Sequence, residues 1–153
     1  MILVILGTQD KEFKRLVRLC NEIKDEDILI QMGNTKEISI HRSFDFCSAI
    51  EFNKLIDQAE LIISHGGVGA LMSSLFKNKK VIAIPRLMEY KEHQNDHQIE
   101  IVKFLEKKDY LIAFNKGDNL KELIKLARSK KFSSISSNNQ NFVNKIKEYI
   151  DKM

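Results

Sequence analysis

The 153-residue sequence contains one proline, two cysteines and no long hydrophobic run. No stretch approaches the 18 consecutive apolar residues that suggest a membrane-spanning helix, so we expect no transmembrane segment. Cys20 and Cys47 match no metal-ligand spacing, and we expect both to behave as small hydrophobic residues in a reducing cytosol. Residues 1–6 lack the basic segment and the cleavage site of a signal peptide, and we interpret them as a strand.

The sequence also lacks the motifs of several enzyme classes. Gly7-Thr8, after the first expected strand, permits close approach of a ligand to the backbone, but the GxGxxG pattern of dinucleotide-binding sites is incomplete. Ser73 and Ser74 lie inside an expected helix without a nucleophile elbow around them. No pair of carboxylates suggests a general acid and a general base. The catalytic residues are therefore unknown from the sequence.

Apolar runs alternate with segments of helical periodicity. Strands are expected at residues 1–6, 28–32, 61–63, 81–84 and 110–114, and Ile38 and Ile40 suggest a further short one. Asp10, Ser48 and Asp118 are the expected N-caps of three helices. The alternation predicts an α/β fold of one domain, residues 1–153, with a Rossmann-like parallel sheet and helices on both faces.

Positive charge gathers at the C-terminal end. Residues 115–153 carry 9 Lys and Arg against 4 Asp and Glu, whereas residues 1–114 carry 16 against 17. Such an end suits anionic lipid, nucleic acid or an acidic partner, but no motif supports nucleic acid, and a solvated lysine-rich face explains the charge equally well. Residues 130–139 are interpreted as a polar linker to a last helix, which packs on its own domain or reaches a partner. Its apolar stripe is Phe142, Ile146, Tyr149 and Ile150.

The turn HGGVG at residues 65–69 follows one expected strand and begins an expected helix. Its glycines, Gly66, Gly67 and Gly69, let a ligand approach the backbone, and the helix start offers free N–H groups and the positive end of a dipole. A diphosphate is the natural ligand of such a turn, and a tight connection without a ligand is the alternative. The turn lies at the carboxyl end of a strand, where open α/β sheets bind ligands.

Polar residues after the strand at 81–84 extend this candidate site. Arg86, directly after Pro85, is suited to offset phosphate charge, although it also suits a solvent-facing position. Asp96 and Gln98 are suited to bind hydroxyl groups of a ligand, unless Asp96 only caps a helix. His93 and His97 have i, i+4 spacing, but their surroundings do not match HExxH, so we expect no metal site.

Together these segments resemble a known family. SHGGVG at residues 64–69, KKVIAIPR at 79–86 and EHQNDHQ at 92–98 resemble the C-terminal, donor-binding domain of glycosyltransferase family 28. The chain is especially similar to the small soluble subunit of two-subunit bacterial glycosyltransferases for capsule and exopolysaccharide. It is also similar to the soluble subunit of the eukaryotic enzyme that adds the second N-acetylglucosamine to the dolichol-linked precursor.

The resemblance implies one lobe of a GT-B hexosyltransferase, inverting and independent of metal and of cofactors. The chain would bind a UDP-sugar, which is a substrate, and a membrane-anchored partner subunit would bind the lipid-linked acceptor and supply the base. We expect the protein in the cytoplasm, at the inner face of the membrane through this heterodimer. The implied donor-binding residues are Gly7, Thr8, His65, Gly66, Gly67, Gly69, Ser73, Arg86, His93, Asp96, His97 and Gln98.

One departure from the family pattern leaves the choice of donor open. Many relatives have a glutamate that holds the ribose hydroxyls where this chain has Ser73. A serine hydroxyl forms hydrogen bonds but carries no charge. A second hypothesis is therefore a non-catalytic module that binds a nucleotide sugar and activates or stabilises a partner transferase.

Overall fold

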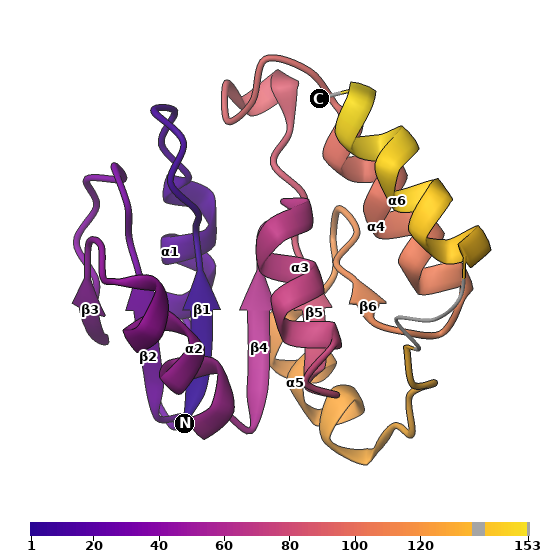
Figure 1. The fold of residues 1–153 in the computed structure, drawn as a ribbon. Coiled ribbons are helices and arrows are strands. Elements are labelled where there is room, and N and C mark those ends of the chain that lie inside the picture. Colours follow the sequence, from indigo (N-terminus) through magenta and orange to yellow (C-terminus); the bar gives the residue numbers. More distant parts are fainter. Residues whose placement is uncertain (136–139, 153) are drawn as a thin grey trace.

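A six-stranded parallel sheet with helices on both faces forms the protein in the computed structural model, which describes residues 1–135 and 140–152 (Figure 1). The strands are β1 (Ile2–Ile5), β2 (Ile28–Gln31), β3 (Arg42–Phe44), β4 (Leu61–Ser64), β5 (Lys80–Ala83) and β6 (Ile112–Ala113). Their order in the sheet is β3-β2-β1-β4-β5-β6. The order reverses between β1 and β4, and such a switch point is where α/β sheets bind ligands.

Two hydrophobic cores lie on the two faces of the sheet because side chains alternate along each strand. In β1, Ile2 and Val4 belong to one core, whereas Leu3 and Ile5 belong to the other. Strands that are buried on both faces read as continuous apolar runs, which explains the composition of β1 and β4.

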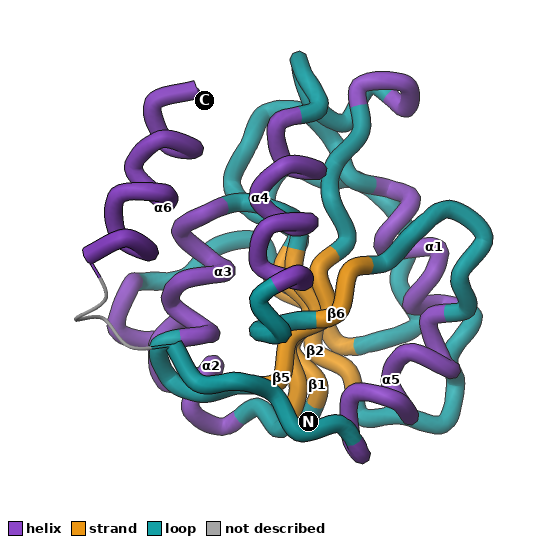
Figure 2. Tube along the Cα trace, turned by 90° about the vertical axis from the view of Figure 1, so that its right-hand side faces the viewer, coloured by secondary structure: helices purple, strands orange, loops and turns teal. Residues whose placement is uncertain are grey.

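Six helices and one 3-10 turn connect and cover the strands in the described part of the chain. They are α1 (Lys14–Asn21), α2 (Ala49–Gln58), α3 (Val68–Leu75), η1 (Met88–Tyr90), α4 (His97–Lys107), α5 (Leu120–Ser129) and α6 (Gln140–Lys152). Helices α1 and α5 pack on one face, and α2, α3, α4 and α6 on the other (Figure 2). None of the described helices is long and apolar enough to cross a membrane.

Several local expectations are confirmed and others are wrong. Ser48 caps α2 in a capping box with Glu51, as predicted. The third strand is β3, after the segment with Ile38 and Ile40, whose side chains are exposed rather than part of a core. Helix α1 starts at Lys14, beyond the expected cap at Asp10.

The cap of α5 is also one residue away from its predicted position. Asn119 accepts the hydrogen bond from the N–H of Glu122, whereas Asp118 accepts one from the N–H of Asn115 in the preceding turn. The two neighbouring side chains therefore accept from two different backbone N–H groups, one in the helix and one in the turn before it.

Helix α6 packs on its own domain. The Phe142 ring stacks on Phe104 of α4 at 6.3 Å between centroids and meets Tyr110 edge-on at 5.7 Å. Ile146, one turn further along, is also buried in this core. The side chains of Tyr149 and Ile150, and residues 136–139 of the predicted linker, lie outside the described residues.

This packing predicts that α6 contributes to the stability of the domain. Replacing Phe142 with alanine should lower the free energy of unfolding by about 3 kcal/mol, because it removes a buried aromatic side chain. Urea denaturation followed by circular dichroism measures the effect. Lys147→Ala, on the exposed side of the same helix, should stay within about 0.5 kcal/mol of the unchanged protein. Equal stability of the two variants would contradict the packing.

Candidate functional site

A cavity of about 510 Å³ lies at the switch point, beyond the carboxyl ends of β1, β2 and β4. No Lys, Arg, Asp or Glu is among its described lining residues. Its walls come from the loop after β1, the start of α2 and the turn between β4 and α3. The lining residues are Ile5, Gly7, Thr8, Gln9, Gln31, Phe46, Cys47, Ser48, Ala49, Phe52, His65, Gly67, Gly69 and Ala70.

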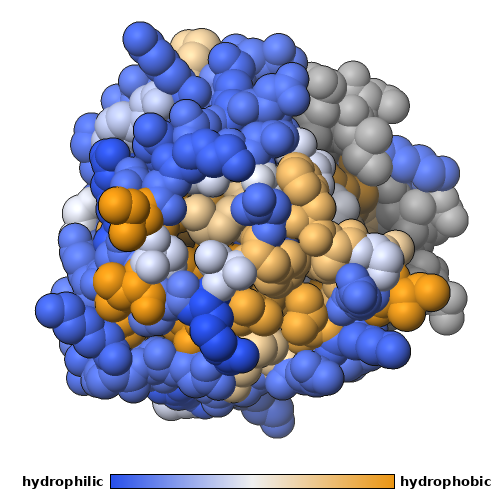
Figure 3. Space-filling view, turned by 90° about the vertical axis from the view of Figure 1, so that its left-hand side faces the viewer, coloured by the Kyte–Doolittle hydropathy of each residue, from blue (hydrophilic) through white to orange (hydrophobic). Residues whose placement is uncertain are grey.

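Hydrophobic side chains surround the cavity on the side of β3 and α2. Figure 3 views the molecule from this side and shows apolar surface between polar borders. Phe46, which follows β3, and Ile50, in α2, are exposed hydrophobic side chains, with exposed fractions of 55% and 70%. Phe46 and Phe52 also line the cavity, so one wall of it is aromatic.

The ring of His65 forms part of the floor and requires glycine on both sides. A Cβ atom on Gly7 would lie 2.7 Å from Nε2 of His65, and one on Gly67 would overlap Cε1. Gly7 also has a φ of 95°, which favours glycine. Two of the glycines that we predicted as ligand contacts are thus needed to accommodate this imidazole.

The imidazole of His65 is neutral. Burial lowers its pKa to about 3, and the charges of Arg86 and His93 act in the same direction. The N–H of Gly67 donates to Nδ1 at 3.1 Å, so Nδ1 is the acceptor and the proton lies on Nε2. His65 therefore presents an uncharged N–H donor beside Gly7.

The N-terminal residues of two helices line the cavity. Helix α3 has Gly67 as its N-cap without a side-chain cap, and its first helical hydrogen bond runs from Leu71 N–H to Gly67 carbonyl. The N–H groups of the first three helical residues, 68–70, thus have no acceptor within the helix. Helix α2 begins at the same cavity with Ser48 and Ala49. Two positive dipole ends and free N–H groups make this cavity suitable for an anion.

Gln31 fixes the loop after β1, and the sequence analysis did not select it. Its side-chain Oε1 accepts from the N–H of Gly7 at 3.0 Å, and its Nε2 donates to the carbonyl oxygens of Gly7 and Asp45, each at 3.0 Å. The sequence did contain a signal for this role, since Gln31 is a polar residue at the end of an apolar strand. A buried amide there needs hydrogen-bond partners, and the neighbouring loops provide them. The wall of Phe46, Cys47 and Phe52 gave no comparable signal.

The structure brings together part of the predicted site. Five of the twelve residues line the cavity, namely Gly7, Thr8, His65, Gly67 and Gly69, and Gly66 lies directly beside them. Ser73 is half-buried one turn further along α3 and is not among the lining residues.

Arg86 has a different position from the expected one. Its side chain is 1% exposed, and its guanidinium donates to the carbonyl oxygens of Leu6, Lys11 and Glu92. It also lies over the ring of Phe13, 4.9 Å from the centroid. Burial lowers the pKa of Arg86 to about 10, so the group stays charged at neutral pH. It lies inside the protein and not at the surface or in the cavity.

The remaining predicted residues lie along the segment before α4 and at its start. Gln98 is 1% exposed, and His93 is 8% exposed with Nδ1 accepting from the N–H of Asn95. Asp96 is exposed and accepts from the N–H of Met88 at 2.8 Å, so it does not cap α4 with its side chain. Nδ1 of His97 is buried and has no hydrogen-bond partner in the described part of the chain. Among these four residues, as far as the structure describes them, His97 is the one with a buried side-chain nitrogen that is free to bind a ligand.

Among the residues that the structure describes, no three His, Cys, Asp or Glu side chains lie close enough together to hold one metal ion. His93 and His97 flank the start of α4, with the exposed Asp96 between them.

Comparisons with known proteins identify relatives along the whole chain. The family profile of the glycosyltransferase family 28 C-terminal domain matches residues 1–153. The sequence is 34% identical, over 93 residues and 60% of this chain, to the UDP-N-acetylglucosamine transferase subunit ALG13 of Candida albicans.

Two solved glycosyltransferase structures share the fold. The glycotransferase of kitacinnamycin has a TM-score of 0.65 at 13% identity, and SnogD from Streptomyces nogalater has 0.53 at 14%. Each similarity covers 99% of this chain. The predicted fold class, α/β with a Rossmann-like parallel sheet and helices on both faces, is therefore confirmed.

The chain spans only part of these relatives. It covers 29% of the Candida albicans protein and 37% and 40% of the two solved structures.

The neutral His65 predicts a pH dependence of stability. The unfolded chain binds a proton on this residue below its ordinary pKa of 6.5, whereas the folded chain does so only near 3. The free energy of unfolding should therefore fall as pH is lowered through this window, by at most about 1.4 kcal/mol per pH unit from this residue.

Denaturation of the protein and of His65→Asn between pH 3 and 8 measures the contribution. Other titrating groups affect both proteins alike, so the difference between their curves isolates His65. Parallel curves across the whole range would show that His65 is not held neutral.

Proposed function

The chain belongs to the glycosyltransferase family 28 C-terminal domain family, and we propose that it is the donor-binding subunit of a hexosyltransferase. It binds a UDP-sugar and forms the donor half of an active site that transfers a hexose or N-acetylhexosamine to a lipid-linked saccharide. The observation that carries the proposal is the cavity at the switch point, which has no ionic lining residue and is lined by the N-terminal residues of α2 and α3.

A diphosphate fits the chemistry of this cavity. The N–H groups at the start of α3, the hydroxyl group of Thr8 and Nε2–H of His65 are neutral donors around one space. In a water-excluded site, fixed donors of this kind stabilise the negative charge that develops on a leaving diphosphate. We infer that the reaction is inverting and needs neither a metal ion nor a cofactor.

The other parts of a UDP-sugar have partners near the same cavity. The rings of Phe46 and Phe52 offer an apolar wall for the uracil base. Ser73 offers a hydroxyl group on α3, and His93, Asp96 and His97 lie on the segment that leads into α4. We assign these last residues to the side of the sugar.

A partner subunit completes the proposed enzyme. The chain covers 37% and 40% of the two GT-B structures, so it accounts for less than half of such an enzyme. The ALG13 relative is itself described as a transferase subunit. We infer that a membrane-anchored partner binds the acceptor, supplies the catalytic base and holds this chain at the inner face of the membrane in bacterial capsule or exopolysaccharide synthesis.

Gly69 is the position at which the cavity can be obstructed without disturbing the fold. A Cβ atom there meets no other atom within 4 Å, whereas one on Gly67 would displace His65. Gly69→Leu should weaken UDP binding by at least about tenfold, roughly 1.4 kcal/mol, because its side chain enters the space for the phosphates. Isothermal titration calorimetry measures this change.

Gly69→Ala serves as the matched control for folding. It should keep the melting temperature or raise it, because alanine favours the helix more than glycine does. Unchanged UDP affinity in folded Gly69→Leu would place the nucleotide elsewhere.

The purified chain alone should transfer no sugar, because its relatives have a second lobe. Co-expression with a membrane-anchored partner should allow transfer from radiolabelled UDP-N-acetylglucosamine or UDP-glucose to a lipid-linked acceptor. Rapid transfer by the chain alone would refute the two-subunit proposal. If the partner transfers sugar equally well with Gly69→Leu, the chain is a non-catalytic activating module instead.

A further inference from the structure

We propose that Gln98 is a positioning residue, whose side-chain carbonyl fixes the Gly66–Gly67 turn and thereby aims the free N–H groups of α3 into the cavity. The proposal rests on the proposed function, because it assigns a role in building the diphosphate site. It also removes Gln98 from the group of residues that would contact the sugar directly.

The hydrogen bonds of Gln98 carry the inference. Its Oε1 accepts from the backbone N–H of Gly66 and from that of Arg86, both at 2.9 Å. A carbonyl oxygen has two lone pairs, so this atom has no remaining capacity for a sugar hydroxyl. The side chain is 1% exposed. Gln98 therefore holds the protein backbone and is not accessible to a ligand in this conformation.

The contact between Gln98 and the turn also requires glycine at position 66, because the two residues are closely packed. A Cβ atom on Gly66 would lie 2.7 Å from Cβ of Gln98. The N–H of Gly66 is occupied by the glutamine, so it cannot also bind a phosphate. The next residue, Gly67, is the N-cap of α3. The direction of the first peptide groups of α3 thus follows from how Gln98 holds Gly66.

Arg86 gives Gln98 a rigid second anchor. While its backbone N–H binds Gln98, its guanidinium binds the carbonyl oxygens of Leu6, next to Gly7, and of Lys11. Through Arg86, the amide side chain of Gln98 therefore connects the turn after β4 to the loop after β1. These are two of the walls of the cavity.

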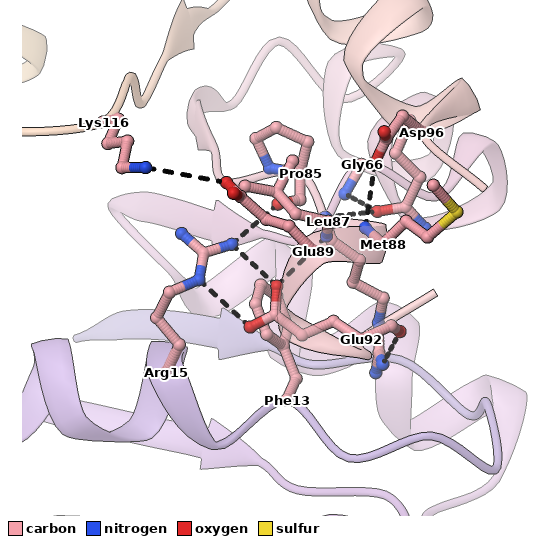
Figure 4. Close-up of polar contacts among 12 residues, drawn as sticks. Phe13, Arg15, Gly66, Pro85, Leu87, Met88, Glu89, Glu92, Asp96 and Lys116 are labelled. Carbon is pink, nitrogen blue, oxygen red and sulfur yellow. Dashed lines mark hydrogen bonds and ion pairs between the residues drawn. The ribbon is translucent and has the colours of Figure 1, made fainter. Parts of the chain in front are cut away.

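Side-chain hydrogen bonds also hold the segment before α4, and this segment places Gln98 at the start of that helix. Figure 4 shows Glu92 accepting from Arg15, with Nε–Oε2 and Nη2–Oε1 distances of 3.0 and 2.9 Å, and from the N–H of Leu87 at 3.1 Å. Asp96 binds the N–H of Met88 nearby. Gln98 is the second residue of α4 and is reached directly from this braced segment.

Gln98→Met tests the proposal because methionine has a similar volume and cannot accept these two hydrogen bonds. A positioning role predicts that UDP and UDP-N-acetylglucosamine both bind about tenfold more weakly, by the same factor. A sugar contact instead predicts that only the sugar nucleotide loses affinity. Calorimetry with each ligand separates these outcomes. It is done under conditions where circular dichroism shows the variant fully folded, because partial unfolding would also weaken both ligands by one factor.

A second readout needs no ligand. Amide hydrogen exchange at Gly66, measured by NMR, should be slow in the unchanged protein and faster in Gln98→Met. Gln98→Glu keeps the acceptor and should keep the Gly66 amide protected, while Gln94→Met, an exposed residue of the same segment, should leave both exchange and UDP affinity unchanged.

The outcomes distinguish the two proposals. Unchanged UDP affinity or unchanged Gly66 exchange in Gln98→Met overturns the positioning role, and so does selective loss of the sugar nucleotide. If the unchanged protein binds neither ligand, the proposed function fails, and the exchange of Gly66 alone decides whether Gln98 sets the turn.

Discussion

A buried positive charge, the guanidinium of Arg86, is the constraint on which the site edge of this protein depends. A desolvated guanidinium is costly unless its N–H groups find acceptors. Carbonyl oxygens of three separate segments accept from its two Nη groups, while its Nε has no partner among the described residues. Those carbonyls belong to the end of β1, the approach to α1 and the segment after η1, so satisfying one charge brings three loops together. Phe13 covers the remaining face of the group.

The same arrangement determines how the cavity can attract an anion. The floor holds a neutral imidazole because burial and the nearby Arg86 both disfavour its protonation. The field of a buried cation that lowers the pKa of His65 also favours negative charge in the adjoining space. Helix ends act in the same direction, and they need no reorganisation when charge develops. A site of this kind depends on the positions of backbone groups, so residues that hold the backbone are as important as residues that touch the ligand.

The sequence predicted the sheet and most of its strands, because apolar runs are local signals, and the Gly-rich turn that it selected lines a cavity. It failed where long-range packing decides. Arg86 was predicted to offset phosphate charge, or else to face solvent, and only the loops that fold around it make it internal. Gln98 was predicted as a ligand contact, and only the folded chain shows that its side chain is buried and accepts from the N–H groups of Gly66 and Arg86. The short β3 was misplaced because Ile38 and Ile40 alternate like a strand, yet their side chains have no core to enter.

None of the described Lys and Arg residues of the C-terminal end lines the cavity. Lys80 begins β5, and its Nζ donates to the carbonyl oxygen of Arg128 at the edge opposite the cavity. Arg128 in turn pairs with Glu26 and Glu60, which precede β2 and β4 at that edge. Such exposed ion pairs contribute little stability each. They hold Arg128 far from the site, and no Lys or Arg is among the described residues that line the cavity. Peptide dipoles and the guanidinium of Arg86, buried behind the glycine turn, are therefore the features near the cavity that favour a diphosphate.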